Sequence, residues 1–113
     1  RDRQFGPALV IGSGGVLAEL INDSVTLLLP VDRAAITAAL NSLAVGKVIA
    51  GFRGRKAGDL DAVVAAILGV AAFAEDHWET LLELDVNPLI VRPVGQGVAA
   101  ADALIRIDAS ELK

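Results

Sequence analysis

The longest apolar stretch of the chain, residues 62–74, constrains the fold most strongly. It holds thirteen consecutive uncharged residues and is flanked by acidic residues on both sides. A membrane span needs roughly 20 apolar residues, so this stretch is too short to cross a bilayer. Its apolar positions recur at steps of three and four residues and predict a buried helix, with Asp59 as the N-cap: Leu60, Val63, Val64, Ile67, Leu68, Ala71 and Ala74.

The first third of the chain predicts strands and a second helix. Residues 8–11 are apolar and stop at a run of glycines, which is typical of a strand covered on both faces. Residues 16–21 and 25–29 flank a turn-forming Asn-Asp-Ser and predict a β-hairpin. Asp32 is the expected N-cap of a helix of about three turns, because apolar residues follow it at helical spacing: Ile36, Ala39, Leu40 and Leu43.

The rest of the chain adds strands and one basic loop. Residues 45–50 are short and apolar and predict a strand or a covered loop, and residues 51–58 form a basic loop interrupted by glycines. Residues 79–91 and 98–107 predict two strands around the turn 93–96. The fold class expected is therefore α+β, a mainly antiparallel sheet packed with two helices, rather than a doubly wound parallel sheet.

Composition excludes several classes of protein. The chain has 113 residues, a formal charge of −4 and a pI near 4.8, which argues against a nucleic-acid binder. No cysteine is present, so disulfides and thiolate chemistry are excluded. No signal peptide or membrane segment is visible, which predicts a cytoplasmic protein. The chain opens at Arg1 and contains no methionine, so we expect residues 1–113 to be a single domain cut from a larger protein.

The two final strands predict a metal site. Glu83, Asp85 and Asn87 stand at alternate positions, so on a strand their side chains share one face. If Arg92 pairs with Gly97, paired residue numbers add to 189, and Asn87 lies opposite Asp102. Such oxygen donors suit Mg²⁺, and a carboxylate left bare among apolar residues would need compensation. Alternatively, these polar groups line an open sheet face or cap loops.

Two further segments are candidates for binding phosphate. Backbone N–H groups of a glycine turn can form a nest for an anion, and here the turn is Gly12, Ser13, Gly14 and Gly15. It matches neither a dinucleotide fingerprint, whose third glycine is Leu17 here, nor a P-loop. A plain tight turn that needs positive φ explains it equally. Arg53, Arg55 and Lys56 could hold a phosphoryl group, or could simply be a solvated loop.

The remaining candidates favour structural roles. His77, the one histidine, has no carboxylate at a predictable spacing and is expected at the surface or at a helix end. Phe73 and Trp78 are expected in the core. Glu19 follows the glycine turn and could face the same site, although spacing alone does not show it.

Taken together, these motifs resemble the C-terminal half of the ATP-grasp domain in ADP-forming acyl-CoA synthetases, a group related to the β subunit of succinyl-CoA synthetase. The resemblance covers nearly the whole chain. Its most specific part is the string Glu-Leu-Asp-Val-Asn-Pro-Leu at 83–89, followed by Ala-Asp-Ala at 101–103. Its other parts are Phe-Gly-Pro at 5–7, the glycine turn with Glu19, and Gly-Phe-Arg-Gly-Arg at 51–55.

The resemblance implies a reversible ligation in which a carboxylic acid, CoA and ATP give acyl-CoA, ADP and phosphate. It implies ATP/ADP and Mg²⁺ as cofactors, with Asn87, Asp102 and Asp85 around the metal. Asp85 and Arg53 would be catalytic, and the glycine turn, Glu19 and Arg53 would contact the nucleotide. The partners implied are the remaining ATP-grasp half and the CoA-binding modules, with CoA and the acid bound elsewhere.

The chain also departs from the family. The half that holds the adenine, with its lysine, and the phosphohistidine segment are both absent from the sequence, and His77 matches neither. We therefore expect these residues to be inactive alone. One alternative is a non-catalytic nucleotide-sensing or dimerisation module of the same fold. Another is a dinucleotide-binding fragment built on residues 12–15, in which residues 16–22 would be helical.

Overall fold

In the computed structural model the described residues are 8–12, 23–51, 56–86 and 88–108. Their order along the chain is β1 (Ala8–Gly12), β2 (Ser24–Leu28), α2 (Arg33–Ser42), α3 (Ala44–Ile49), α4 (Leu60–Asp76), β3 (Leu81–Val86), β4 (Leu89–Val91), β5 (Val98–Ala100) and β6 (Ala103–Ile107). All the strand pairs among these elements are antiparallel. The predicted α+β class is confirmed, although the described part has three helices where two were expected.

Strands β1 and β2 form a two-stranded sheet, with Ala8 opposite Leu28 and Gly12 opposite Ser24. The hairpin prediction named residues 16–21 as the partner of this second strand. Those residues lie outside the described part, and the partner found within it is β1. Alternation along both strands places Leu9, Ile11, Val25 and Leu27 on the side that packs into the core.

Both predicted N-caps are confirmed. The Asp32 carboxylate accepts a hydrogen bond from the Ala35 N–H (2.8 Å) at the start of α2. The Asp59 carboxylate accepts one from the Ala62 N–H (3.1 Å) at the start of α4. Each cap satisfies an N–H that has no partner inside its helix.

Residues 45–50 were expected to be a strand or a covered loop, and this prediction is wrong. Residues 44–49 form helix α3. In so short an apolar run, periodicity cannot separate a strand from a buried helix. Here Val45, Val48 and Ile49 also fit helical spacing, and packing against the end of α2 decides the outcome. A Cβ on Gly46 would lie 2.3 Å from the carbonyl oxygen of Leu40, so only glycine permits this approach.

The two long strands expected after residue 78 are each divided in two. Residues 77–80 are a turn, so the first strand begins at Leu81 rather than at Glu79. Strand β4 pairs with β5, and β3 pairs with β6. From Glu83 to Val91 every paired set of residue numbers adds to 189, and the register shifts only between Leu81 and Glu83. The predicted register is therefore confirmed on both sides of the break.

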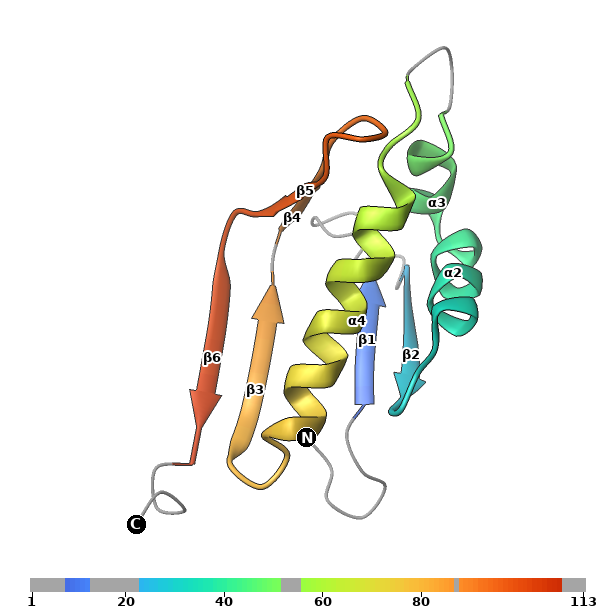
Figure 1. Ribbon diagram of the computed structural model, residues 1–113. Helices are drawn as coiled ribbons and strands as arrows, with labels where there is room; N and C mark the ends of the chain where they lie inside the picture. The colour runs from blue at the N-terminus through green and yellow to red at the C-terminus, as the bar shows by residue number, and fades with distance from the viewer. Residues whose placement is uncertain (1–7, 13–22, 52–55, 87, 109–113) are drawn as a thin grey trace.

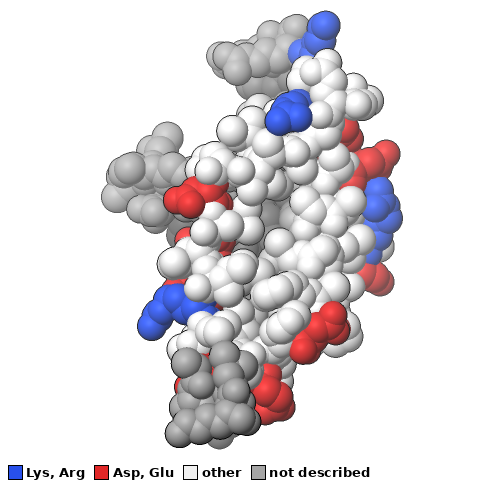
Figure 2. Space-filling view, turned by 60° about the vertical axis from the view of Figure 1, so that its left-hand side comes forward, with Lys and Arg blue, Asp and Glu red and all other residues white. Residues whose placement is uncertain are grey.

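The core lies where the helices meet the strands. Helix α4 lies over the strands and runs roughly along them, with α2 and α3 beside it (Figure 1). Ile36 of α2 and Val64 of α4 are fully buried, and both belong to the central apolar cluster. Within the described residues, no helix combines the length and the apolarity needed to cross a membrane. Charged side chains lie mainly towards the margins of the face in Figure 2, and uncharged side chains occupy its centre.

Candidate metal and phosphate site

The break in the paired strands falls at the predicted metal site. Val86 is opposite Ala103, and the Ala101 N–H donates to the carbonyl oxygen of Pro88 (3.0 Å). The register is thus held immediately before and after the predicted pair Asn87 and Asp102. Asn87 lies outside the described residues, so the pairing of these two side chains remains a prediction. Pro88 has no N–H to donate to a ladder, which is a reason for the strand to be interrupted here.

Asp85 and Glu83 lie on the open face of β3. Both are exposed, whereas the alternating Leu84 and Val86 are partly buried. The Glu83 carboxylate forms an ion pair with Arg106, directly opposite on β6, at 3.4 Å between Oε1 and Nη1. Asp85 lies opposite Leu104. Of these two acidic residues, Glu83 is therefore paired with an arginine in the sheet, whereas the residue opposite Asp85 is apolar.

Asp102 lies in the gap between β5 and β6. Its Oδ1 accepts a hydrogen bond from the Ala103 N–H (2.9 Å), and the residue is exposed. The expectation that Asp85 and Asp102 sit among apolar residues and need compensation is wrong, because water reaches both. The alternative of an open sheet face with a loop-capping carboxylate describes their surroundings. That surface is also accessible to a hydrated ion and to nucleotide phosphates.

The described residues do not complete a metal site by themselves. No group of three or more His, Cys, Asp or Glu side chains in ranges 8–12, 23–51, 56–86 and 88–108 could hold a metal ion. Asp85 and Asp102 supply carboxylate oxygens, the donor type that Mg²⁺ prefers. Mg²⁺ is commonly held by one or two carboxylates together with water and phosphate oxygens, so this donor set fits the ion.

The glycine turn is described only at its first residue. Gly12 ends β1, pairs with Ser24 and does not adopt positive φ. A Cβ there would meet its neighbours at 3.4 Å or more, which is ordinary contact. A tight turn that needs positive φ therefore does not explain Gly12 itself. Ser13, Gly14, Gly15 and Glu19 lie outside the described residues, and their predicted contacts with phosphate are not tested.

The structure describes only the two ends of the basic loop, residue 51 and residues 56–58, which we call its base. Arg53 and Arg55 lie outside the described residues, whereas Lys56 is exposed. The Gly58 N–H donates to the carbonyl oxygen of Ile49 (2.7 Å) and thereby joins the two ends of the loop. Gly58 also bridges to Pro93, and the Val94 N–H donates to the carbonyl oxygen of Ala57 (3.1 Å). The loop thus starts from a base that is fixed to the turn between β4 and β5.

Asp59 joins this base to two other segments, a role that the sequence analysis missed. Besides capping α4, its Oδ2 accepts hydrogen bonds from the N–H groups of Gly95 (3.1 Å) and Gly97 (2.8 Å). These hydrogen bonds, with that from Gly97 contributing most, lower the pKa of Asp59 below its ordinary value of 3.8. Both glycines have positive φ, at 85° and 79°. In the sequence, the two glycines in the turn 93–97 were the signal from which a special turn at this place could have been inferred.

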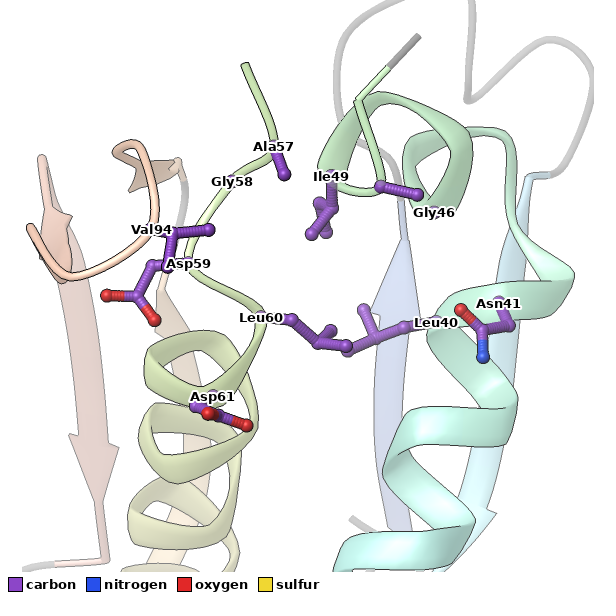
Figure 3. A pocket seen from close by; sticks show the side chains of 11 residues that line it. Leu40, Asn41, Gly46, Ile49, Ala57, Gly58, Asp59, Leu60, Asp61 and Val94 are labelled. Atoms are coloured by element: carbon purple, nitrogen blue, oxygen red, sulfur yellow. The ribbon is translucent and has the colours of Figure 1, made fainter.

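A pocket of about 360 Å³ lies between this base and the ends of α2 and α3. In Figure 3 Leu60 of α4 and Leu40 of α2 point toward one another across it, with Ile49 and Gly46 of α3 above them. The polar side chains at its rim are Asn41, Asp59 and Asp61. Asp59 is already bonded to backbone N–H groups, and Asp61 pairs with Arg33 at 2.9 Å. The pocket therefore separates packed elements and offers few free polar groups.

We expect Asp59→Asn to lower the melting temperature at neutral pH and to have less effect in acid. The folded protein lowers the pKa of Asp59, so its charge contributes stability above the ordinary value of 3.8. That contribution is lost as pH falls from 3.8 through the lowered pKa. Thermal unfolding over this pH range measures the effect, with Asp32→Asn as the control that removes the charge of a carboxylate capping α2 but keeps an oxygen to accept the hydrogen bond. An equal difference between Asp59→Asn and the unmodified protein at all pH values would contradict it.

Near the end of α4, the structure confirms the predicted position of His77 and corrects those of Phe73 and Trp78. His77 is the C-cap of α4 and is exposed, as predicted, and its ring stacks on Phe73 with 4.1 Å between ring centroids. Phe73 and Trp78 were expected in the core, but each is only partly buried. They lie at the helix end, beyond the cluster around Ile36 and Val64.

Comparison with protein families identifies the fold. The sequence model of one family, described as the ATP-grasp domain, matches residues 1–107 of this chain. This chain belongs to the ATP-grasp family. The resemblance read from the sequence is confirmed: the chain corresponds to the C-terminal part of this domain as it occurs in ADP-forming acyl-CoA synthetases.

Several relatives of this ATP-grasp chain are CoA ligases. A trans-feruloyl-CoA synthase from an unknown prokaryote is 35% identical over 107 residues, which are 95% of this chain and 15% of the synthase. The β subunit of the ADP-forming acetate–CoA ligase II of Pyrococcus furiosus is 30% identical over 92% of this chain and 44% of the subunit. The ATP-grasp chain therefore spans less than half the length of these relatives.

Solved structures that are similar in sequence also superpose on this chain. PH1788 from Pyrococcus horikoshii superposes with a TM-score of 0.85 at 28% identity, covering 94% of this ATP-grasp chain and 44% of that one. An acetyl-coenzyme A synthetase of Ca. Korarchaeum cryptofilum, in complex with coenzyme A and Mg-AMPPCP, has a TM-score of 0.85 at 31% identity. There the match covers 95% of this chain and 49% of the synthetase chain.

Proposed function

We propose that this chain is one subdomain, residues 1–113, of an ADP-forming acid–CoA ligase. It would supply contacts to Mg²⁺ and to the nucleotide phosphates during phosphoryl transfer. The parent enzyme would convert a carboxylic acid, CoA and ATP into acyl-CoA, ADP and phosphate. Relatives named as ADP-forming CoA ligases support the reaction class.

The observation that carries this proposal is the register of the last four strands. It holds on both sides of positions 87 and 102, and Asp85 lies on the exposed face of β3. Under the proposal, Asn87, Asp102 and Asp85 hold one Mg²⁺. When bound, the ion would neutralise charge on the nucleotide phosphates, which is the main electrostatic need in phosphoryl transfer.

The other proposed site residues bind and orient the nucleotide. The N–H groups of Gly12, Ser13, Gly14 and Gly15 would donate to phosphate oxygens, and Glu19 would lie beside them. The guanidinium of Arg53 would donate to the phosphoryl group, with its loop held at the base by the Gly58 and Ile49 hydrogen bond. Positioning by fixed donors costs no rearrangement during the reaction, so it lowers the barrier.

The same proposal defines the partners. The remaining ATP-grasp half would hold the nucleotide from the other side, and separate modules would bind CoA and the acid. We expect residues 1–113 alone to form no thioester. The chain covers only part of the length of each relative, which supports the proposal that other parts of the parent enzyme bind CoA and the acid.

Removal of divalent metal tests the proposed reaction. We expect the parent protein to release ADP and phosphate with CoA and a carboxylic acid only when Mg²⁺ is present, because the phosphate charge is otherwise unscreened. A chelator should abolish product formation, and excess Mg²⁺ should restore it. Formation of AMP and pyrophosphate, or turnover with the chelator present, would contradict the proposal.

A further inference from the structure

The segment that leads into α4, residues 57–59, lies against the turn between β4 and β5. Its backbone contacts the β4 side of that turn. The Asp59 N–H donates to the carbonyl oxygen of Arg92 (2.8 Å), and the Val94 N–H donates to that of Ala57 (3.1 Å). In Figure 3 the Asp59 carboxylate points toward this turn and away from Leu60. The start of α4 and the turn are therefore joined by both backbone and side chain.

The carboxylate of Asp59 extends this contact to the β5 side of the turn. Its Oδ2 accepts from the Gly95 N–H (3.1 Å) and from the Gly97 N–H (2.8 Å), and Gly97 directly precedes β5. The carbonyl oxygen of Gly97 accepts from the Arg92 N–H (3.1 Å), which is the hydrogen bond that closes the hairpin. Asp59 thus holds the residue at which the chain returns into β5.

Strand β5 leads from this turn to Asp102. The hairpin is short, with paired positions from Val91 and Val98 to Leu89 and Ala100. In a short hairpin the turn fixes which residues face each other. The position at which the chain leaves β5 and reaches Asp102 therefore depends on how firmly the turn is held.

Groups that hold a metal ligand in place matter for the metal as well as the ligand itself. Removal of such an outer contact commonly lowers metal affinity about 10–100-fold. We propose that Asp59 is a positioning residue for the Mg²⁺ site, which fixes the place of Asp102 by holding the turn between β4 and β5. This inference rests on the proposed function, in which Asp102 is assigned to Mg²⁺.

Asp59→Ser in the full parent protein tests the positioning role. Serine is a good N-cap for α4, but its single short-armed oxygen cannot also serve Gly95 and Gly97. Acyl-CoA formation is measured against free Mg²⁺, at a temperature where circular dichroism shows every variant to be folded. We expect the Mg²⁺ concentration for half-maximal rate to rise about tenfold, with a smaller fall in kcat. Loss of folded protein alone would lower the maximum rate and leave the Mg²⁺ requirement unchanged.

Two further variants make the test specific. Asp59→Asn keeps one oxygen for the cap and replaces the other by an amide nitrogen, which cannot accept from the glycines, so it should raise the Mg²⁺ requirement as Asp59→Ser does. Asp61→Asn is the matched control. It removes the same charge two residues later, where the carboxylate is exposed and pairs with Arg33 at 2.9 Å. Its Mg²⁺ requirement should stay that of the unmodified parent.

Hydrogen exchange of the same proteins, without substrates, measures the hold on the hairpin directly. Both Asp59 variants should exchange faster than Asp61→Asn over residues 97–101, which include the Ala101 N–H bonded to Pro88. Unchanged exchange, or faster exchange with an unchanged Mg²⁺ requirement, would overturn the positioning role. So would an equal effect of Asp61→Asn. These results leave the proposed function standing, whereas an unmodified parent that forms no acyl-CoA with Mg²⁺ would refute that function and this role together.

Discussion

Asp102→Ala in the parent protein is expected to lower ATP-dependent acyl-CoA formation about 100-fold or more. The variant removes a carboxylate that we assign to Mg²⁺, and losses of this size follow the removal of a group that stabilises transition-state charge. Product formation is measured at saturating CoA and acid, across a titration of Mg²⁺. A raised requirement for Mg²⁺ would accompany the lower rate.

Asp102→Asn separates the metal role from the structural role. An asparagine oxygen can still accept the hydrogen bond from the Ala103 N–H, so the melting temperature should stay near that of the unmodified protein. The activity should nevertheless fall, because the charge is gone. Glu83→Ala is the matched control on the same sheet: it removes an exposed ion pair with Arg106, which is worth at most about 1 kcal/mol.

The assignment fails if both Asp102 variants retain full Mg²⁺-dependent activity. It also fails if Glu83→Ala lowers activity as much as Asp102→Ala, since the loss would then follow from any change on this face. Asn87→Ala should behave as Asp102→Ala does, because we assign both side chains to the same ion.

Gly46→Ala is expected to destabilise the fold by about 3 kcal/mol or more. A Cβ at this position would lie 2.3 Å from the carbonyl oxygen of Leu40 and 3.1 Å from the Cα of Asn41. Overpacking commonly costs about 1–3 kcal/mol, and here the obstacle is backbone that cannot rotate away. Helix α3 would have to move from the end of α2, which would disturb the packing of Ile49 in the core. Chemical denaturation of each variant measures the change.

Gly69→Ala is the matched control, because it makes the same substitution in another helix. A Cβ at Gly69 has nothing within 4 Å, and Gly69 lies inside α4. Alanine should therefore stabilise this helix by up to about 1 kcal/mol. If Gly46→Ala is as stable as Gly69→Ala, α3 does not depend on the close approach to α2.

Local features of the sequence were sufficient for much of this fold. Asp32 and Asp59 each precede a run of apolar residues at helical spacing, and both cap the helices predicted. The turn 93–96 set the register of the last strands, because a short turn fixes which residues face each other. The candidate metal residues followed from that register and from the family resemblance, and they could be named before any coordinates.

Contacts between distant segments decided the rest. Residues 44–49 are helical because α2 is available to pack against, and six apolar residues carry too little periodicity to show it. Asp59 bonds to Gly95 and Gly97, more than 30 residues away, and no local pattern reports such a contact. The exposure of Asp85 and Asp102 depends on how the elements are placed in space. Capping, periodicity and turns act over a few residues, whereas burial and sheet edges are set by the whole chain.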